Sequence, residues 1–371
     1  MLHQEKISVR QFTILVFMYT LGTSVIYLPS LVASYGKENG WISVLGSSLI
    51  GFGVVFILNK IAQLDEKKHL FELLEFIFGK WIGRIISVLI LMFVIYLLAT
   101  NLRQIGDFIT TQVMVQTPIY VIMIIFILVS LFAVKLGLEV IGRTSEIFFP
   151  YALFSLILLI VLVAPQADFS NIQPLFRENI AGAFLAVFPA SEVPYFQLFV
   201  FLAIFPSVNK PDKAKKGFYI GVALGSFILF IITFMALMVL GPDFTARNQY
   251  PTYILGKKIS IAEFIERIEI LVAIAWFFSI FFKLTINFYA LSLGVSYLLK
   301  LKSVQTLTTP IAFFVVILGI ILFPNIIYFM DFSQFYWPFF AITFGLFIPL
   351  LMLLIGMIKK RKQGNGSQTP S

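Results

Sequence analysis

Residues 12–33 read FTILVFMYTLGTSVIYLPSLVA and carry no charged side chain. A helix of about twenty apolar residues crosses a hydrocarbon core of ~30 Å, so this stretch predicts a membrane-spanning helix. Its middle, TLGTS at residues 20–24, brings together a glycine and small hydroxyl residues, which disfavour a regular helix. We therefore expect the first span to be interrupted at Gly22, Thr23 and Ser24.

Similar apolar blocks recur along the whole chain. Of its 371 residues, 60% are hydrophobic and 12% are charged, whereas about a quarter of the residues of soluble domains are charged. The blocks are too long and continuous for the alternating strands, of about ten residues each, in a transmembrane barrel. The sequence therefore predicts an all-α integral membrane protein with ten spans: Phe12–Ala33, Trp41–Ala62, Trp81–Leu102, Pro118–Val134, Val140–Ala164, Ile180–Phe205, Phe218–Leu240, Ile268–Leu299, Thr308–Phe323 and Phe335–Ile358.

The distribution of basic residues predicts the orientation of these spans. An even number of spans places both termini on one side, and the cytoplasmic side holds the excess of lysine and arginine. Of the 27 such residues, nineteen fall in segments on the side of the termini and seven on the opposite side, while Lys283 lies within a span. Both termini are therefore predicted to be cytoplasmic. The same alternation explains the net charge of +9 without a nucleic-acid partner.

Few residues of this sequence suit covalent or metal chemistry. The chain has no cysteine, and its two histidines, His3 and His69, lie far apart and outside the apolar blocks. It contains no HExxH motif, glycine-rich phosphate loop or serine–histidine pairing. The sequence therefore predicts neither an enzyme nor a metal or cofactor site.

A second interruption falls in the sixth predicted span, where residues 188–194 read FPASEVP. Spans one and six each begin one half of a ten-span chain, and transporters built from two inverted repeats break their helices at matching positions around the ligand. Unwinding frees N–H and C=O groups that are costly in lipid, so such breaks persist where they face a cavity or a ligand. We expect Ala190, Ser191 and Glu192 to join Gly22 at a ligand site. Two packing kinks are the alternative.

Two ionisable residues lie inside predicted spans, where a charge is costly and usually functional. Glu192 is either a ligand contact or a carboxylate that caps the broken helix through backbone N–H groups. Lys283 lies near the middle of span eight, with Asn287 one turn further on. We interpret Lys283 as a fixed cation at the place where sodium-coupled proteins of this architecture hold an ion. The alternatives are a lysine that snorkels along the bundle or pairs statically with a carboxylate.

Two pairs of aromatic and hydroxyl residues, spaced i,i+4, suit a small amphipathic ligand. They are Tyr96 with Thr100 on span three, and Thr285 with Tyr289 on span eight. At 100° per residue, Lys283 and Thr285 lie about 200° apart around their helix, so both cannot point into one pocket. Either Thr285 and Tyr289 face the ligand while Lys283 points to an ion position, or one of the two stripes is packing.

Three segments outside the spans have patterns of their own. Residues 68–78 place apolar residues opposite Glu72 and Glu75 at helical spacing, which predicts an interfacial helix on the cytoplasmic face. Residues 259–269 show a similar pattern on the outer side. Residues 363–371 are polar, and we expect a disordered cytoplasmic tail after one membrane domain of residues 1–362.

Three stretches resemble a known family. They are residues 19–29 (YTLGTSVIYLP), 137–143 (GLEVIGR) and 206–208 (PSV). They are similar to the B subunits of spore germinant receptors, also called the spore permease family, and the resemblance extends over nearly the whole chain. That family falls within the amino acid–polyamine–organocation superfamily. The resemblance therefore implies a five-plus-five inverted repeat, the LeuT-like fold.

The resemblance also implies a site and a function. It places Gly22, Tyr96, Thr100, Thr285 and Tyr289 in a pocket walled by spans one, three, six and eight. It implies a germinant sensor in the spore inner membrane that works with an A-type subunit and a lipoprotein C-type subunit. Ligands of the family are typically amino acids, and sometimes sugars or nucleosides, so we expect a small nutrient, an amino acid, to bind at mid-membrane.

A proton-coupled amino-acid permease is the alternative function, with Lys283 as its coupling group. It shares the fold and the site with the receptor subunit, so the sequence barely separates the two.

Overall fold

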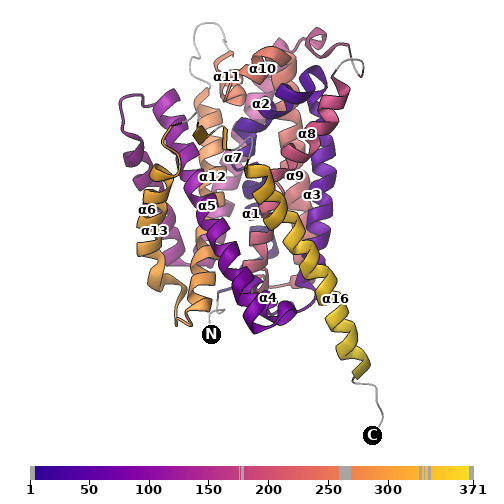
Figure 1. The fold of residues 1–371 in the computed structure, drawn as a ribbon. Coiled ribbons are helices and arrows are strands. Elements are labelled where there is room, and N and C mark those ends of the chain that lie inside the picture. Colours follow the sequence, from indigo (N-terminus) through magenta and orange to yellow (C-terminus); the bar gives the residue numbers. More distant parts are fainter. Residues whose placement is uncertain are drawn as a thin grey trace.

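The computed structural model describes residues 5–174, 176, 179–258, 269–325, 328–329, 331–332 and 336–366. Within these ranges, side chains are described as far as Lys360. Within these ranges the chain is helical, without strands, and has one isolated parallel bridge between Ile7 and Val208. The first helix begins and the last helix ends at the same end of the bundle (Figure 1). This is the arrangement expected for an even number of spans.

The predicted ten-span, all-α architecture is confirmed. Among the described residues, nine helical stretches are long and apolar enough to cross a membrane, and one of them, Ser24–Ala62, has 39 residues and contains the second half of span one together with span two. The short apolar helix Val9–Leu21 completes the first span. In order, the spans are α1 with α2 (Val9–Leu21, Ser24–Gly36), α3 (Gly40–Ala62), α5 (Lys80–Gln112), α6 (Ile119–Leu136), α7 (Leu138–Val163), α8 with the 3-10 helix η4 (Ile180–Glu192, Phe196–Ala203), α9 (Pro211–Leu240), α12 (Glu269–Leu298), α13 (Thr308–Ile321), and α15 with α16 (Trp337–Ile342, Ile348–Gly366).

Two helices end later than the sequence predicted. α5 continues past Leu102 to Gln112, because Arg103 and Asp107 pair one turn apart at 3.0 Å and neutralise each other inside the bundle. α16 continues to Gly366, past the expected boundary at residue 362. The remainder of the predicted tail lies outside the described residues.

The first half of span one packs closely on α9, and small residues make this approach possible. Gly217, Gly221 and Gly225 recur every four residues on α9 and face α1. A Cβ added at Gly221 would lie 2.7 Å from the carbonyl oxygen of Thr13, closer than real Cβ atoms come. Small residues at this spacing let helix backbones approach each other in a membrane, where lipid is as apolar as the helix surface. Helix α1 is therefore fixed against α9.

Residues just before α1 join three spans at the end of the bundle that holds the termini. The backbone N–H of Ile7 donates to the carbonyl oxygen of Ser207 at 2.9 Å, and the N–H of Asn209 donates to the carbonyl oxygen of Ile7 at 2.9 Å. The Glu5 carboxylate accepts a hydrogen bond from the N–H of Leu138, the first residue of α7, at 2.5 Å. We call this group of contacts the terminal seam, and it links the segment before α1 to α7 and to residues 207–209.

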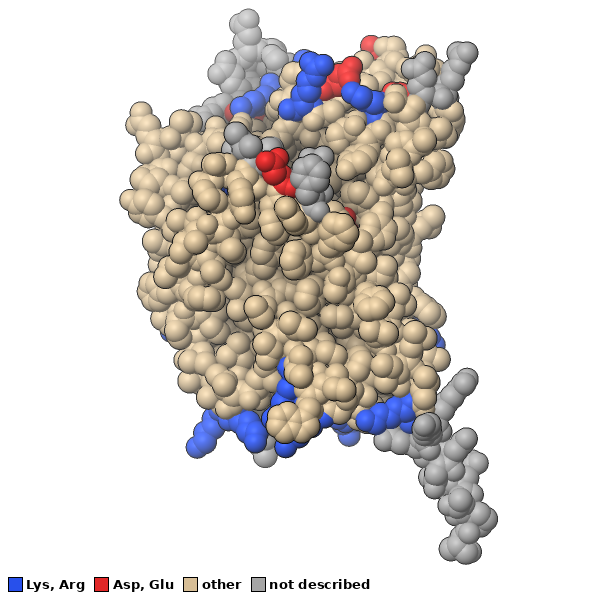
Figure 2. Space-filling view, in the orientation of Figure 1, with Lys and Arg blue, Asp and Glu red and all other residues tan. Residues whose placement is uncertain are grey.

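Charge divides the surface into two ends and a middle. Lys and Arg gather at the end with the termini, whereas the opposite end carries basic and acidic residues together; the band between them shows neither over most of its height in this view (Figure 2). Helix α4 (Leu70–Phe78) lies at the end with the termini and confirms the helix predicted within residues 68–78 (Figure 1). Residues 259–268, where a second surface helix is predicted, lie outside the described residues.

Candidate ligand-binding site

The first interruption lies between α1 and α2. Gly22 has a φ of +29°, a backbone conformation that residues with side chains rarely adopt. Its N–H donates to the carbonyl oxygen of Met18 at 2.9 Å and so completes α1. Thr23, the residue before α2, makes no side-chain capping bond, so no described side chain occupies the first N–H groups of this helix. The break therefore presents backbone donors.

The second interruption follows α8, which ends at Glu192. Pro194 has no N–H to continue the helical ladder, and the chain resumes as the 3-10 helix η4. Between them, the carbonyl oxygen of Val193 accepts a hydrogen bond from Lys283 Nζ at 3.0 Å. This break therefore presents backbone acceptors.

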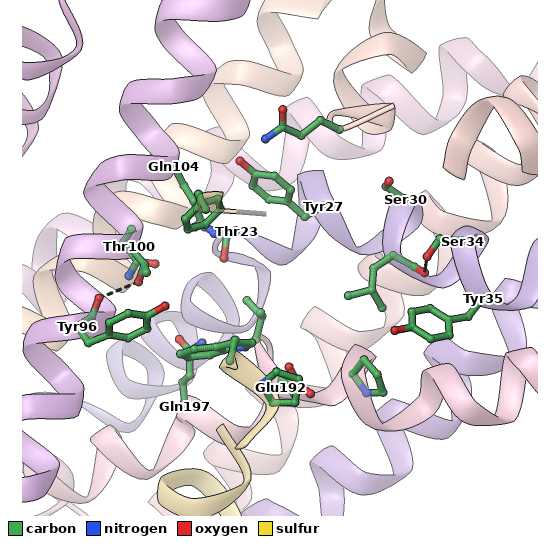
Figure 3. A pocket seen from close by; sticks show the side chains of 18 of the residues that line it. Thr23, Tyr27, Ser30, Ser34, Tyr35, Tyr96, Thr100, Gln104, Glu192 and Gln197 are labelled. Carbon is green, nitrogen blue, oxygen red and sulfur yellow. Dashed lines mark hydrogen bonds between the residues drawn. The ribbon is translucent and has the colours of Figure 1, made fainter. Parts of the chain in front are cut away.

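Both interruptions border one cavity with a volume of about 430 Å³. Its walls come from α2, α5, the end of α8 with the turn into η4, and the start of α15, while Ala246 and Gln249 cover it at the end opposite the termini. Figure 3 shows the side chains around this space. Its polar lining consists of Thr23, Tyr27, Ser30, Ser34, Tyr35, Tyr96, Thr100, Asn101, Gln104, Glu192, Gln197, Gln249 and Trp337.

Several polar atoms of this lining have no hydrogen-bond partner among the described residues. They are Oε1 of Glu192, Oε1 of Gln197, Oε1 of Gln104, Nδ2 of Asn101 and Nε1 of Trp337. Glu192 and Gln197 are each only 3% exposed. An unpaired buried polar atom costs about 1–3 kcal/mol, so a bound molecule that supplies partners is favoured.

Four predicted site residues reach the cavity: Thr23, Tyr96, Thr100 and Glu192 (Figure 3). Gly22, Ser24, Ala190 and Ser191 lie beside them in the chain but outside the lining. The capping role considered for Glu192 does not fit its position. It is the last residue of α8, at the carbonyl end of the helix, and its Oε1 accepts no hydrogen bond from the described residues.

The predicted residues of span eight do not line the cavity. Thr285 is fully buried and donates to Ser130 Oγ of α6 at 3.2 Å. Tyr289 is 3% exposed and belongs to the hydrophobic core. Lys283 faces the two interruptions instead, which agrees with its angular separation from Thr285. Asn287, one turn on, accepts a hydrogen bond from Tyr19 OH at 2.8 Å.

One wall of the cavity was missed by the sequence reasoning, because it comes from span ten. Trp337 and Pro338 line the cavity from the start of α15, and the Trp337 ring stacks on Tyr96 with a centroid distance of 5.7 Å. Pro338 lies in the first helical turn, where a missing N–H is tolerated. Gln197 was also missed, although an amide within the apolar run of η4 is itself a signal of a polar contact.

Known proteins share this sequence pattern. Residues 6–329 match the family model described as "Spore germination protein". Spore germination protein KB of Bacillus subtilis (strain 168) is 26% identical over 366 residues, which cover 98% of this chain and 97% of that protein. Spore germination protein XB of Bacillus anthracis is 22% identical over 343 residues, covering 91% of this chain and 94% of that protein.

Solved structures share the fold. MHP1, a nucleobase-cation-symport-1 family transporter with bromovinylhydantoin bound, has a TM-score of 0.67 at 11% identity, covering 88% of this chain and 74% of that chain. MhsT in complex with L-phenylalanine has a TM-score of 0.58 at 16% identity, covering 95% of this chain and 99% of that chain. At such low identity these similarities concern the fold alone, and they confirm the predicted LeuT-like architecture.

Proposed function

Because this chain belongs to the family of spore germination proteins, we propose that it is the germinant-sensing membrane subunit of a spore germination receptor. Its ligand is a small nutrient, an amino acid, that binds in the cavity between α2, α5, α8 and α15. The observation that carries this proposal is the set of unpartnered polar atoms where two interrupted helices meet.

The two interruptions offer partners for both charges of an amino acid. The N-terminal end of α2 carries the partial positive charge of a helix dipole and uncapped N–H groups, which suit a carboxylate. Glu192 supplies a carboxylate for an ammonium group on the opposite wall. The volume of about 430 Å³ lies within the range of small-molecule sites. The complex of MhsT with L-phenylalanine supports the choice, because it shows an amino acid bound by a protein of this fold.

The same proposal assigns the orientation and the partners. The end with the terminal seam and the gathered Lys and Arg faces the cytoplasm, in agreement with the positive-inside rule (Figure 2). Ala246 and Gln249 then separate the cavity from the outer side of the spore inner membrane. An A-type subunit and a lipoprotein C-type subunit are the protein partners, and membrane lipid surrounds the bundle.

A ligand screen on the purified full-length protein tests this proposal. The proteinogenic amino acids, glucose and inosine are each added, and the midpoint of thermal unfolding is measured. A ligand at about one hundred times its Kd stabilises a protein by about 2.7 kcal/mol, which is readily detected. We expect at least one amino acid to stabilise the protein, and less so when Glu192→Gln is introduced. If no compound raises the midpoint, the proposed ligand site is wrong.

A proton-coupled amino-acid permease is the second candidate, and the transporters among the solved structures of this fold favour it. Proteoliposomes that contain the protein alone separate the two functions. Accumulation of a labelled amino acid, driven by a proton gradient, would identify a permease. Binding without accumulation is the result expected for a receptor subunit.

A further inference from the structure

Lys283 of α12 lies where the two interruptions meet, and its side chain is 0% exposed. Its Nζ donates to the carbonyl oxygen of Val193 at 3.0 Å and lies 5.0 Å from the centroid of the Tyr19 ring in α1. Its Cδ passes Gly22 so closely that a Cβ on residue 22 would be 2.5 Å away. One side chain therefore contacts the end of α1, the break beside it and the break after α8.

The charge of Lys283 has no acidic partner within the part of the chain that the structure describes. The groups that face its ammonium are a carbonyl dipole and the ring of Tyr19, both of which attract a cation. Tyr19 is held in place because its hydroxyl donates to Asn287 Oδ1 at 2.8 Å. A buried charge with these partners alone is costly to keep, which indicates a function beyond packing.

The contacts of Lys283 also reach the ligand cavity. Val193 lines that cavity, and so does Glu192, its neighbour in the chain. A ligand that binds Glu192 would therefore contact the residue next to the carbonyl group that accepts the hydrogen bond from Lys283. The same side chain fills the space beside Gly22, at the junction between α1 and α2.

We propose that Lys283 is a built-in cation that couples the ligand cavity to the hinge at Gly22 through the carbonyl group of Val193. It is a positioning residue: it holds both interruptions in one arrangement when the cavity is empty and transmits their displacement when a ligand binds. The coupling deepens the proposed function and rests on it for the ligand readout. It needs no free ion at this position.

Two substitutions at Lys283 in the full-length protein test the coupling. K283M removes the charge at similar length, and K283Q removes the charge but keeps an N–H donor. The ligands are those of the thermal screen: the proteinogenic amino acids, glucose and inosine. We expect the ligand concentration for half-maximal binding to both variants to stay within about threefold of that for the unsubstituted protein. The ligand concentration that triggers germination of spores should rise about tenfold or more. S279A is the matched control, because Ser279 lies one turn before Lys283 on α12 and, among the described residues, its hydroxyl donates only to the carbonyl oxygen of Ala275 in the same helix.

A measurement without ligand separates the role of Lys283 from the proposed function. The chain has no cysteine, so S24C provides a single thiol beside the first interruption, where Ser24 is 2% exposed. S87C provides a distant thiol on α5, where Ser87 is 0% exposed. When K283M is added, we expect a maleimide to label S24C about tenfold faster and S87C at an unchanged rate, since only the structure around the hinge loosens.

Several results would overturn the proposal. A germination response of K283M equal to that of the unsubstituted protein would do so, and so would unchanged labelling of S24C. Faster labelling of both thiols would show general loosening, that is, a merely structural role. A normal response from K283Q would show that a neutral donor suffices. If no compound in the panel stabilises the unsubstituted protein, the proposed function fails, while the labelling rates still decide the role of Lys283.

Discussion

The two interrupted spans break their helices in different ways. In span one the chain turns at Gly22 and resumes as an α-helix after Thr23, so the break presents the N–H groups of a new helix. In span six the chain passes through Pro194 and continues as a 3-10 helix, so the break presents carbonyl groups and the carboxylate of Glu192. The first interruption therefore presents hydrogen-bond donors, and the second presents hydrogen-bond acceptors.

This difference teaches how the proposed site offers a partner to each charge of an amino acid although its described lining contains no lysine, arginine or histidine. The positive end is a helix N-terminus, equivalent to about half an elementary charge, and the negative end is a side chain. Lys283, which has no acidic partner among the described residues, lies behind the wall and contacts both interruptions. Substitutions on each side of the cavity therefore have different expected effects.

Gly22→Val, on the donor side, is expected to have the largest effect. A Cβ at residue 22 would lie 2.5 Å from Lys283 Cδ and 2.9 Å from the carbonyl oxygen of Tyr19, in an unfavourable backbone conformation. Overpacking and backbone strain of this kind cost about 1–3 kcal/mol each, so α1 and α2 change their relative arrangement. Spores should lose the ligand response while the protein stays in the membrane fraction. Gly53→Val is the control, because Gly53 has no atom within 4 Å of an added Cβ. A normal response from Gly22→Val would remove the interrupted-helix hypothesis.

Glu192→Gln tests the acceptor side, with a smaller expected effect. Loss of a charged hydrogen bond to an ammonium group weakens binding by about 1.5–3 kcal/mol, or roughly tenfold to one-hundredfold in Kd. The thermal midpoint without ligand should not fall, because Glu192 Oε1 has no partner in the described part of the chain. Glu139→Gln serves as the comparison, since Glu139 lies at the surface and pairs with Arg143. An unchanged ligand affinity would show that the carboxylate does not contact the ligand.

Trp337→Phe probes the wall from span ten and should have a modest effect. The phenylalanine ring keeps a stack on Tyr96 but removes the Nε1–H, which has no protein partner among the described residues. The loss of one neutral hydrogen bond corresponds to about 0.5–1.5 kcal/mol of binding free energy, measured as a weaker ligand midpoint. Trp81→Phe is the control at a 79% exposed position. Equal ligand midpoints for both variants would mean that the Trp337 ring contributes to binding through its shape and not through its Nε1–H.

The smallest effect on ligand binding is expected from Thr285→Val. Thr285 donates to Ser130 on the far side of α12, so its loss should lower the free energy of unfolding by about 1 kcal/mol and leave the ligand midpoint unchanged. Thermal unfolding with and without ligand measures both quantities. A large loss of affinity would favour the position that the family resemblance implies for Thr285.

Most of the fold was predictable because its determinants are local. The length of each apolar block predicts a membrane span, and lysine and arginine residues mark the ends of the spans. Gly22 and Pro194 mark the interruptions of spans one and six. The breaks also led to Thr23 and Glu192, which reach the cavity. These features depend on a residue's own segment and need no knowledge of its neighbours in space.

The remainder of the site depends on contacts between distant segments. The rotation of α12 about its axis depends on packing against α1, α5, α6 and α7, and it turns Thr285 toward Ser130 of α6. Spacing along one helix does not reveal that rotation. Trp337 looks like an ordinary aromatic residue near the start of the last span. Only the return of span ten beside α5 brings it against Tyr96.

The terminal seam has a consequence for permeability. Ile7 pairs with Ser207 and Asn209 through main-chain atoms alone, so side-chain substitutions other than proline leave these hydrogen bonds intact. None of the three residues lines the cavity. While the seam stays paired, the segment before α1 is held against residues 207–209 at the end of the bundle with the termini. Under the proposed function, we expect these main-chain hydrogen bonds to keep this end closed to solutes while a ligand occupies the cavity.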